Sequence, residues 1–454
     1  MLDTIIIGLI ILSALVYGFW QYFAEPDDAH RKKKNEANKR NDDYVPKDNK
    51  SSTAKKLSET TNINNKTNIN KNSKRSNLKK RTDKTNYSHN WLLTTLKGHT
   101  GSVMDMSFSA NGKYLATCAD DRTILIWYMR DLYNAKDRKT FRINVEYDHV
   151  YKLVWSPDSK AILGFKATDN SIEVYRLERK DGSFTSYGRS ITFPRAHEND
   201  DVISLDIACN GRFIMSASNK TELIIWDIRG NVLEQLNTFT MSNYCAKISP
   251  CGRFVGVSGY APDVKFWEVK FGKTGNYEKT VKAFDLIGHN AGVWDFAFDQ
   301  DASHCVTVCK DGYWRLFDIN IDYARGESPR CLLTGEYESK AVSPLIALSN
   351  SAHVIVIGCG NNIQFFSGLN GNLDNTIENV FYDHIMSIAF DSLGLQLYVA
   401  GDRQVRVFHN ITGYKVGIEV AKEKLKDKKT TAATRERLES QVEEYENFIA
   451  ENAE

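Results

Sequence analysis

The chain has 454 residues, of which 42% are hydrophobic and 11% aromatic, enough for one large core or for two or three ordinary domains. Its eight cysteines fall in an apolar, strand-rich region without a C-x-x-C pair, which argues against a disulfide-stapled secreted domain and against a zinc site. The formal net charge is only +2, but residues 24–90 hold 18 Lys and Arg against 9 Asp and Glu. The basic character therefore belongs to one segment.

The first element in chain order is an uncharged apolar run from Thr4 to Ala24. It has about the 20 residues that an α-helix needs to cross a bilayer, and Trp20 and Tyr22 near its end suit the membrane interface. A cleavable signal peptide is the alternative, although no basic residue precedes the run and no A-x-A-like site follows it. The basic stretch HRKKK at 30–34 favours the cytosolic side. We therefore predict a transmembrane signal-anchor at 1–24, with the rest of the chain in the cytosol.

Residues 25–90 are rich in Asn, Lys, Ser and Thr and poor in apolar side chains. Such a segment cannot bury enough apolar area to offset its conformational entropy, so we expect a disordered basic linker. Its positive charge either serves solubility or attracts anionic lipid headgroups or RNA phosphates. Tyr44 and Tyr87 are its only aromatic residues, so sequence-specific nucleic-acid recognition is not indicated, whereas charge-driven association with RNA or the ribosome stays open.

Between residues 91 and 410 the chain consists of short β-branched and aromatic runs with turn residues every eight to twelve positions. Aromatic strand endings recur seven times, at intervals of 41 to 51 residues, at Trp127, Tyr175, Trp226, Trp267, Phe317, Phe366 and Phe408. Seven units of four strands predict an all-β fold, a seven-bladed β-propeller. We expect WLLTTL at 91–96 to complete the last blade and thereby close the ring.

The first unit brings a histidine, a hydroxyl, a carboxylate and an indole within thirty positions, namely His99, Thr117, Asp121 and Trp127. The first three groups are also those of a nucleophilic hydrolase, but such a site is recognised by geometry and not by spacing. The sequence contains no Gly-rich phosphate loop, nucleophile elbow or metal-binding helix. We therefore predict no enzymatic activity, no cofactor and no metal, although propellers host several chemistries and an enzyme remains the alternative.

These units resemble the repeats of the WD-repeat family, which open with Gly-His and close with Trp-Asp. The matching openings are Gly98-His99, Ala196-His197 and Gly288-His289, with Asp148-His149 and Asp383-His384 as variants. The matching closings are Trp226-Asp227 and Phe317-Asp318. In that family the His, a Ser or Thr of the second strand, the turn Asp and the Trp form a structural hydrogen-bond network inside the blade.

The resemblance implies such a structural network in three units. It comprises His99, Thr117, Asp121 and Trp127 in the first, His197, Ser216 and Trp226 in the third, and His289, Thr307, Asp311 and Phe317 in the fifth. Lys220 stands at the Asp position of the third unit, and Phe317 brings no indole donor to the fifth. The fourth and sixth units lack the opening His. A catalytic site would not be copied in partial form around a ring, whereas a packing device can be lost from single blades.

Residues 411–454 are rich in Lys, Glu, Ala, Leu and Arg. Apolar side chains follow helical spacing at Leu438, Val442, Tyr445 and Ile449, and KDKKTT at 426–431 is expected to separate two helical pieces. This C-terminal helical segment either packs back on the propeller or serves as a partner helix or self-association coil.

Within the WD-repeat proteins, the order of features is similar to that of a membrane-anchored subfamily. The similarity is carried by stretches such as SANGKYLATCADDRTI at 109–124, PDVKFWEVKFGKTG at 262–275 and GDRQVRVFHN at 401–410. The subfamily's members are regarded as single-pass proteins of the endoplasmic-reticulum membrane linked to the unfolded protein response. The resemblance implies a non-enzymatic scaffold or adaptor whose cytosolic propeller binds proteins, the PKR-like endoplasmic reticulum kinase among them, with ribosomes or messenger RNA as further partners. A membrane-trafficking or coat-associated scaffold is the alternative.

Overall fold

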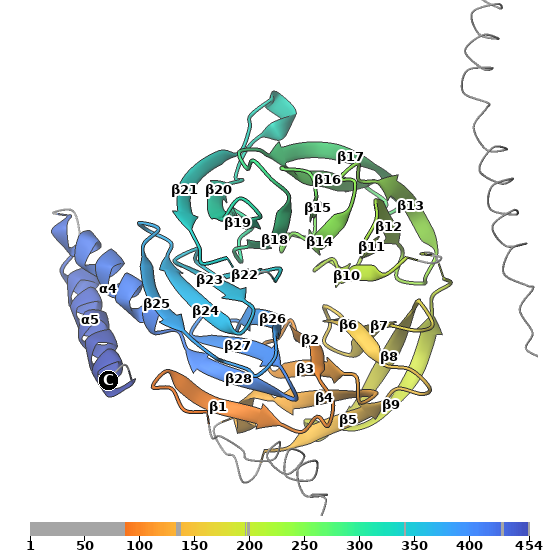
Figure 1. Ribbon diagram of the computed structural model, residues 1–454, viewed down its shortest axis with the longest axis horizontal. Coiled ribbons are helices and arrows are strands. Elements are labelled where there is room, and N and C mark those ends of the chain that lie inside the picture. The colour runs from red at the N-terminus through yellow and green to blue at the C-terminus, as the bar shows by residue number, and fades with distance from the viewer. Residues whose placement is uncertain are drawn as a thin grey trace, which may run out of the picture. The chain divides into compact units, whose positions relative to one another are not determined.

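The computed structural model describes residues 87–132, 138–195, 197, 200–339, 342–427 and 431–452. Their strands form seven antiparallel sheets of four strands each, arranged as blades around a central axis (Figure 1). Blades 1 to 6 take their strands in chain order from β2 to β25, and blade 7 combines β26, β27 and β28 with β1. The prediction of a seven-bladed propeller is confirmed.

Each blade has a first strand next to the axis and a fourth strand at the rim (Figure 1). The first strands are β2 (Val103–Phe108), β6 (Val150–Trp155), β10 (Val202–Ile207), β14 (Asn243–Ile248), β18 (Val293–Phe298), β22 (Leu345–Leu348) and β26 (Ile385–Phe390). The second strands are β3 (Tyr114–Ala119), β7 (Ala161–Lys166), β11 (Ile214–Ser218), β15 (Phe254–Gly259), β19 (His304–Cys309), β23 (Val354–Cys359) and β27 (Gln396–Gly401).

The outer half of each blade consists of its third and fourth strands. The third strands are β4 (Thr123–Tyr128), β8 (Ser171–Lys180), β12 (Glu222–Trp226), β16 (Val264–Phe271), β20 (Tyr313–Asp318), β24 (Asn362–Ser367) and β28 (Gln404–His409). The fourth strands are β5 (Thr140–Asn144), β9 (Ser183–Thr192), β13 (Val232–Asn237), β17 (Tyr277–Leu286), β21 (Arg330–Glu336), β25 (Leu373–Ile377) and β1 (Leu92–Lys97). Two short 3-10 helices, η2 (Met129–Asp131) and η3 (Tyr323–Arg325), follow β4 and β20.

The core lies between the blades. Every residue of β3 and β4 is buried, because the middle strands of a blade are covered on both faces by neighbouring blades. Successive side chains of a strand point to opposite faces, so Ile126 packs between blades 1 and 2 while Trp127 packs between blades 7 and 1. Seven such clusters, one at each interface between blades, make up the hydrophobic core.

Strand β1 closes the ring by pairing with β28, with Leu96 opposite Val405. The closing strand expected at 91–96 is therefore confirmed. Contacts with blade 7 begin earlier than the sequence indicated, within the segment assigned to the linker. The ring of Tyr87 meets the edge of Phe408 at 6.4 Å between centroids, and the Arg406 guanidinium lies 3.9 Å from the Tyr87 ring centroid.

The C-terminal segment forms two antiparallel helices, α4 (Ile411–Lys426) and α5 (Ala432–Asn452), beside blades 6 and 7 (Figure 1). Their separation falls within the KDKKTT stretch, as expected. Tyr414 stacks on Phe448 at 4.3 Å between ring centroids, and Ile411 and Ile449 join the cluster between blades 6 and 7. These contacts favour the interpretation that the segment packs back on the propeller.

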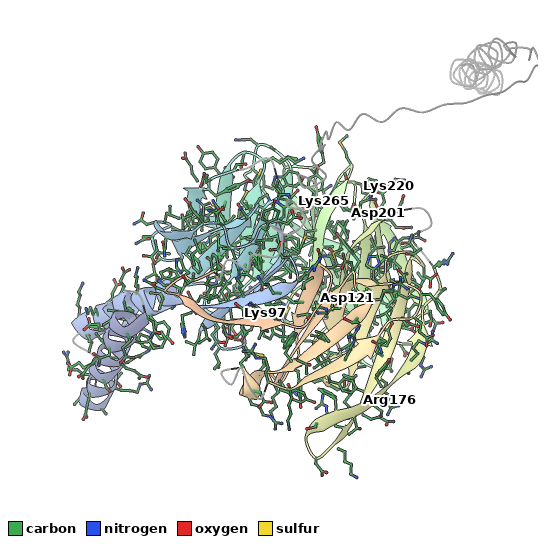
Figure 2. The ribbon with its side chains drawn as sticks, turned by 60° about the horizontal axis from the view of Figure 1, so that its bottom comes forward. Lys97, Asp121, Arg176, Asp201, Lys220 and Lys265 are labelled. Carbon is green, nitrogen blue, oxygen red and sulfur yellow. The ribbon has the colours of Figure 1, made fainter. Side chains whose placement is uncertain are left out.

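The blades have two ends. The upper face carries the turns between second and third strands and the loops that lead from one blade to the next, and the lower face carries the remaining connections. Figure 2 shows Lys220 and Lys265 at the upper end and Arg176 toward the lower end.

Among the described residues, no helix is both long enough and apolar enough to span a membrane. The membrane span predicted at 1–24, and the linker predicted at 25–90 except for residues 87–90, lie outside the residues that the structure describes.

Candidate functional site

Blade 1 brings together the four side chains singled out in the sequence. Trp127 Nε1 donates to Thr117 Oγ1 at 3.0 Å, and His99 Nε2 lies 2.8 Å from the same hydroxyl. His99 Nδ1 lies 3.2 Å from Asp121 Oδ2. One tautomer satisfies every group: Thr117 O–H donates to Nε2, and Nδ1–H donates to the carboxylate. The network thereby links the loop before β2 to β3, the next turn and β4.

The electrostatics of blade 1 suit a structural network better than a nucleophilic site. Burial would raise the pKa of Asp121, but hydrogen bonds from Thr123 and Thr100 and the nearby His99 outweigh it and lower the pKa to about 2. Burial lowers the pKa of His99, so its ring is neutral at physiological pH. Thr117, the would-be nucleophile, is 0% exposed. A substrate cannot reach this hydroxyl.

In blade 3 a different carboxylate completes the network. His197 Nε2 lies 2.7 Å from Ser216 Oγ, which also accepts a hydrogen bond from Trp226 Nε1 at 2.9 Å. Lys220, at the Asp position of the repeat, is exposed and pairs with Asp200. Glu222, at the first position of β12, lies 2.5 Å from His197 Nδ1. Glu222 was not predicted from the sequence, although it places a carboxylate two residues beyond the expected Asp position.

Blade 5 keeps the histidine, the hydroxyl and the carboxylate but not the indole. His289 Nε2 lies 2.7 Å from Thr307 Oγ1, and Nδ1 lies 3.3 Å from Asp311 Oδ2. Phe317 fills the indole position and is buried without a donor. Arg315 reaches into the network, where its guanidinium contacts His289 and pairs with Asp311 at 3.1 Å. Burial and the Arg315 charge lower the pKa of His289 to about 4.

His289, Cys309 and Asp311 place three ligand-type atoms within 4.8 Å of one another. The group fits a metal ion poorly, because the Arg315 guanidinium already supplies the positive charge beside Asp311 and His289. Burial raises the pKa of Cys309 to about 11, and its thiol donates to the Ala291 carbonyl. These residues therefore fit the hydrogen-bond network of the blade better than a metal site.

In the two units with variant openings, a carboxylate and backbone amides connect the opening to the turn between the second and third strands. In blade 2, Asp148 accepts hydrogen bonds from the amides of Thr168 and Asp169 at 2.9 and 3.0 Å. In blade 7 the turn residue Asp402 accepts from the amides of Tyr382 and Asp383. The neighbouring His149 and His384 are not placed against a second-strand hydroxyl and lie partly exposed and exposed, respectively.

A cavity of about 570 Å³ lies along the axis and is lined by first strands of several blades. Three carboxylates in it each accept a hydrogen bond from an amide of the next blade: Asp105 from Leu153, Asp206 from Ile248, and Asp295 from Ile346. Lys247 neutralises Asp295 at 2.7 Å, and burial raises the pKa of Asp206 to about 6. These carboxylates were not predicted from the sequence, although three units carry an Asp on the first strand. They join neighbouring blades around the axis.

Large apolar side chains are exposed on the upper face. Tyr147 and Tyr382 are 94% and 97% exposed, and Phe239, Met241 and Ile287 are also exposed. All five lie on loops that lead from one blade to the next. Loops on a rigid scaffold commonly carry binding residues, so this face is the candidate interaction surface.

Comparison with known proteins supports the repeat assignment. The family model described as "WD domain, G-beta repeat" matches residues 90–128, 188–227 and 279–318, the segments that contain the networks of blades 1, 3 and 5. Transducin beta-like protein 2 of Mus musculus is 39% identical over 373 residues, covering 82% of this chain and 84% of the relative. The protein of that name from Homo sapiens is 39% identical over 374 residues, covering 82% and 83%.

A more distant similarity involves the nuclear distribution protein PAC1 of Arthroderma otae, which is 23% identical over 251 residues, about half of each chain. The repeat matches and the propeller agree with the extensive identity to transducin beta-like protein 2. The chain therefore belongs to the WD-repeat family, together with transducin beta-like protein 2.

Proposed function

We propose that the protein is a non-enzymatic scaffold that binds other proteins through its propeller. The main support comes from the polar cluster in blade 1. Each of its four side chains is hydrogen-bonded to another side chain of the cluster. The hydroxyl that a hydrolase would use is inaccessible, whereas large apolar side chains are exposed on loops of the upper face. This distribution suits binding better than catalysis.

The proposal places this scaffold at the endoplasmic-reticulum membrane as a single-pass protein with the propeller in the cytosol. Support comes from the apolar run at 4–24 and the basic stretch at 30–34. Protease treatment of sealed microsomes tests the orientation. We expect the propeller to be digested and the sequons at Asn49, Asn65, Asn86, Asn219 and Asn410 to carry no glycans. A protected or glycosylated chain contradicts this topology.

The partner proposed from the subfamily resemblance is the PKR-like endoplasmic reticulum kinase, which would give the scaffold a role in the unfolded protein response. The net positive charge of residues 24–90 supports a further association with RNA or the ribosome. A membrane tether raises the effective concentration of anything the propeller holds near membrane partners, to about the millimolar range when the linker's reach matches the distance.

Proximity labelling from the full chain, compared with a chain lacking residues 1–24, tests the function with and without stress. We expect the full chain to label the kinase under stress and the shortened chain to lose that labelling. If both chains label the same proteins, the tether has no role in partner choice. Coat subunits or small GTPases in place of the kinase favour the trafficking alternative.

A further inference from the structure

The loop between blades 3 and 4 holds two large apolar side chains outward. Phe239 and Met241 are each 76% exposed, and both have positive φ angles, 53° and 67°. A non-glycine residue in this region costs about 1 kcal/mol or more. The alternate residues Thr238 and Thr240 point inward, where their buried hydroxyls donate to Asn243 Oδ1 at 2.7 and 2.5 Å. The loop is thus anchored in a conformation that presents Phe239 and Met241 to solvent.

Two further exposed apolar side chains lie beside this loop. Tyr260 is on the turn between β15 and β16, and its amide donates to the Ser242 carbonyl at 2.8 Å. Ile287 begins the next loop, in which a Cβ at Gly292 would stand only 3.0 Å from the Tyr260 carbonyl oxygen. The turn of blade 4 therefore lies between the two loops, and the four side chains belong to one part of the upper face.

Lys310 lies on the adjacent turn of blade 5, and its ammonium group contacts neutral aromatic side chains. Its Nζ donates to Tyr244 Oη at 2.7 Å and lies 4.5, 4.2 and 5.5 Å from the ring centroids of Tyr244, Trp294 and Tyr260. Among the described residues Lys310 makes no ion pair, and the neighbouring Asp311 is directed to His289 and Arg315. This ammonium is a fixed positive charge without a local carboxylate partner, at the edge of the apolar side chains.

We propose that Phe239, Met241, Tyr260, Ile287 and Lys310, here called the blade 4 patch, bind an extended acidic and apolar peptide segment of a partner protein. A carboxylate of the peptide pairs with Lys310, where the aromatic rings reduce hydration and strengthen the ion pair. Aliphatic or aromatic side chains of the peptide cover the four apolar residues. The proposal rests on the proposed scaffold function and specifies the surface and the chemistry of its partner.

The charge of the patch decides between an acidic and a basic partner. Aromatic rings alone would also attract a cation. Here Lys310 already occupies the faces of Tyr244 and Trp294, so a second cation would meet both repulsion and a filled site. The patch therefore selects negative charge.

A displayed library of random 12-residue peptides, selected on the full chain, tests the proposal. We expect enriched peptides to combine Asp or Glu with aliphatic or aromatic residues. Their affinity is expected to fall at least tenfold with Lys310→Glu and with the double change Phe239→Ser and Met241→Ser. Lys113→Glu, on the lower face, is the matched control and leaves the affinity unchanged. These positions are exposed, so circular dichroism should show intact folds for all variants.

A charge exchange provides the second arm. Replacing the acidic residue of the best peptide by Lys should abolish binding to the unchanged protein. The Lys310→Glu variant should bind this changed peptide at least tenfold more tightly than it binds the original peptide. Enrichment of basic peptides, no enrichment, or peptides indifferent to Lys310→Glu overturns the proposal. None of these results contradicts the scaffold function if proximity labelling still detects stress-dependent neighbours. The absence of any specific neighbour in that experiment contradicts the scaffold function itself.

Discussion

At the scale of single residues, the histidine networks act as cross-links between segments far apart in sequence. His99 and Asp121 are 22 positions apart, and His197 and Glu222 are 25 apart. Each buried donor or acceptor in such a network is costly to leave unpaired, so one lost side chain affects all the others. Stability is the property that should respond to these residues.

Asp121→Ala should lower the free energy of unfolding by about 1 to 3 kcal/mol, because His99 and the Thr100 amide lose their acceptor. Urea unfolding measures the change, and Asp120→Ala, at the exposed neighbouring carboxylate, should be nearly neutral. A folded Asp121→Ala protein that has lost a hydrolase activity contradicts the structural interpretation.

In blade 3 the residue at the Asp position of the repeat, Lys220, differs from the residue that accepts the His197 hydrogen bond, Glu222, so their effects on stability can be compared. Glu222→Ala should destabilise the protein by about 1 to 3 kcal/mol because it removes the partner of His197. Lys220→Ala should change stability by less than about 0.5 kcal/mol, since the Lys220 side chain is exposed. Thermal unfolding of the two variants decides the matter, and equal losses would falsify the assignment of Glu222.

His289 should make stability depend on pH. Its pKa is about 4 in the folded protein and 6.5 when unperturbed, so between these values only the unfolded chain binds the proton. The contribution of neutral His289 to the free energy of unfolding is complete above pH 6.5 and decreases as the pH falls toward 4. Between pH 7 and pH 5 we expect a loss of about 2 kcal/mol from this residue. Urea midpoints should show a shallower pH dependence for His289→Gln, and an unchanged one for the exposed control His384→Gln.

At the scale of elements, the closing strand makes blade 7 depend on a segment that precedes blade 1. Besides pairing with β28, β1 supplies acceptors to Arg138, whose guanidinium donates to the Thr95 carbonyl at 2.9 Å and to the Thr94 hydroxyl at 2.8 Å. Leu96 also joins the cluster between blades 7 and 1. Both blades therefore require this strand.

Removing residues 1–97 should lower the melting temperature and expose the β28 amides to hydrogen exchange, because an unpaired strand edge is left beside blade 1. Removing residues 1–86 retains Tyr87 and the whole of β1, and should leave both properties unchanged. Hydrogen exchange of β28 that is equal in the two shortened proteins would show that closure does not depend on this strand.

At the scale of the whole molecule, each blade shares its apolar core with both neighbours, and β1 joins the last blade to the first. No blade has a core of its own, so the loss of one interface exposes apolar area on two blades. The ring should therefore unfold as one cooperative unit, unlike an open array whose end repeats can separate.

Ile355→Ala, in the cluster between blades 5 and 6, should lower the free energy of unfolding by about 2 to 5 kcal/mol. We expect tryptophan fluorescence and far-ultraviolet circular dichroism to shift together to one lower urea midpoint, with little change for the exposed Leu332→Ala. Separate midpoints for the two signals would show that the blades next to Ile355 unfold independently.

The sequence by itself determined the number of blades, the closing strand and the break between the C-terminal helices. These features follow from local patterns: aromatic strand endings that recur at intervals of 41 to 51 residues, an apolar run at 91–96 before the first unit, and a polar interruption at 426–431. The groups of blade 1 could also be named in advance through their resemblance to the WD repeat, whose opening His and closing aromatic residue recur in the third and fifth units.

Only the tertiary structure decided which side chains reach one another. Glu222 takes the place of a turn carboxylate because the first residue of β12 lies as close to His197 as the missing Asp would, a relation that depends on two distant segments. Arg315 enters the network of blade 5 for the same reason. The neutral surroundings of Lys310 depend on Tyr244 and Trp294 from distant segments of the chain, and no local pattern encodes these contacts.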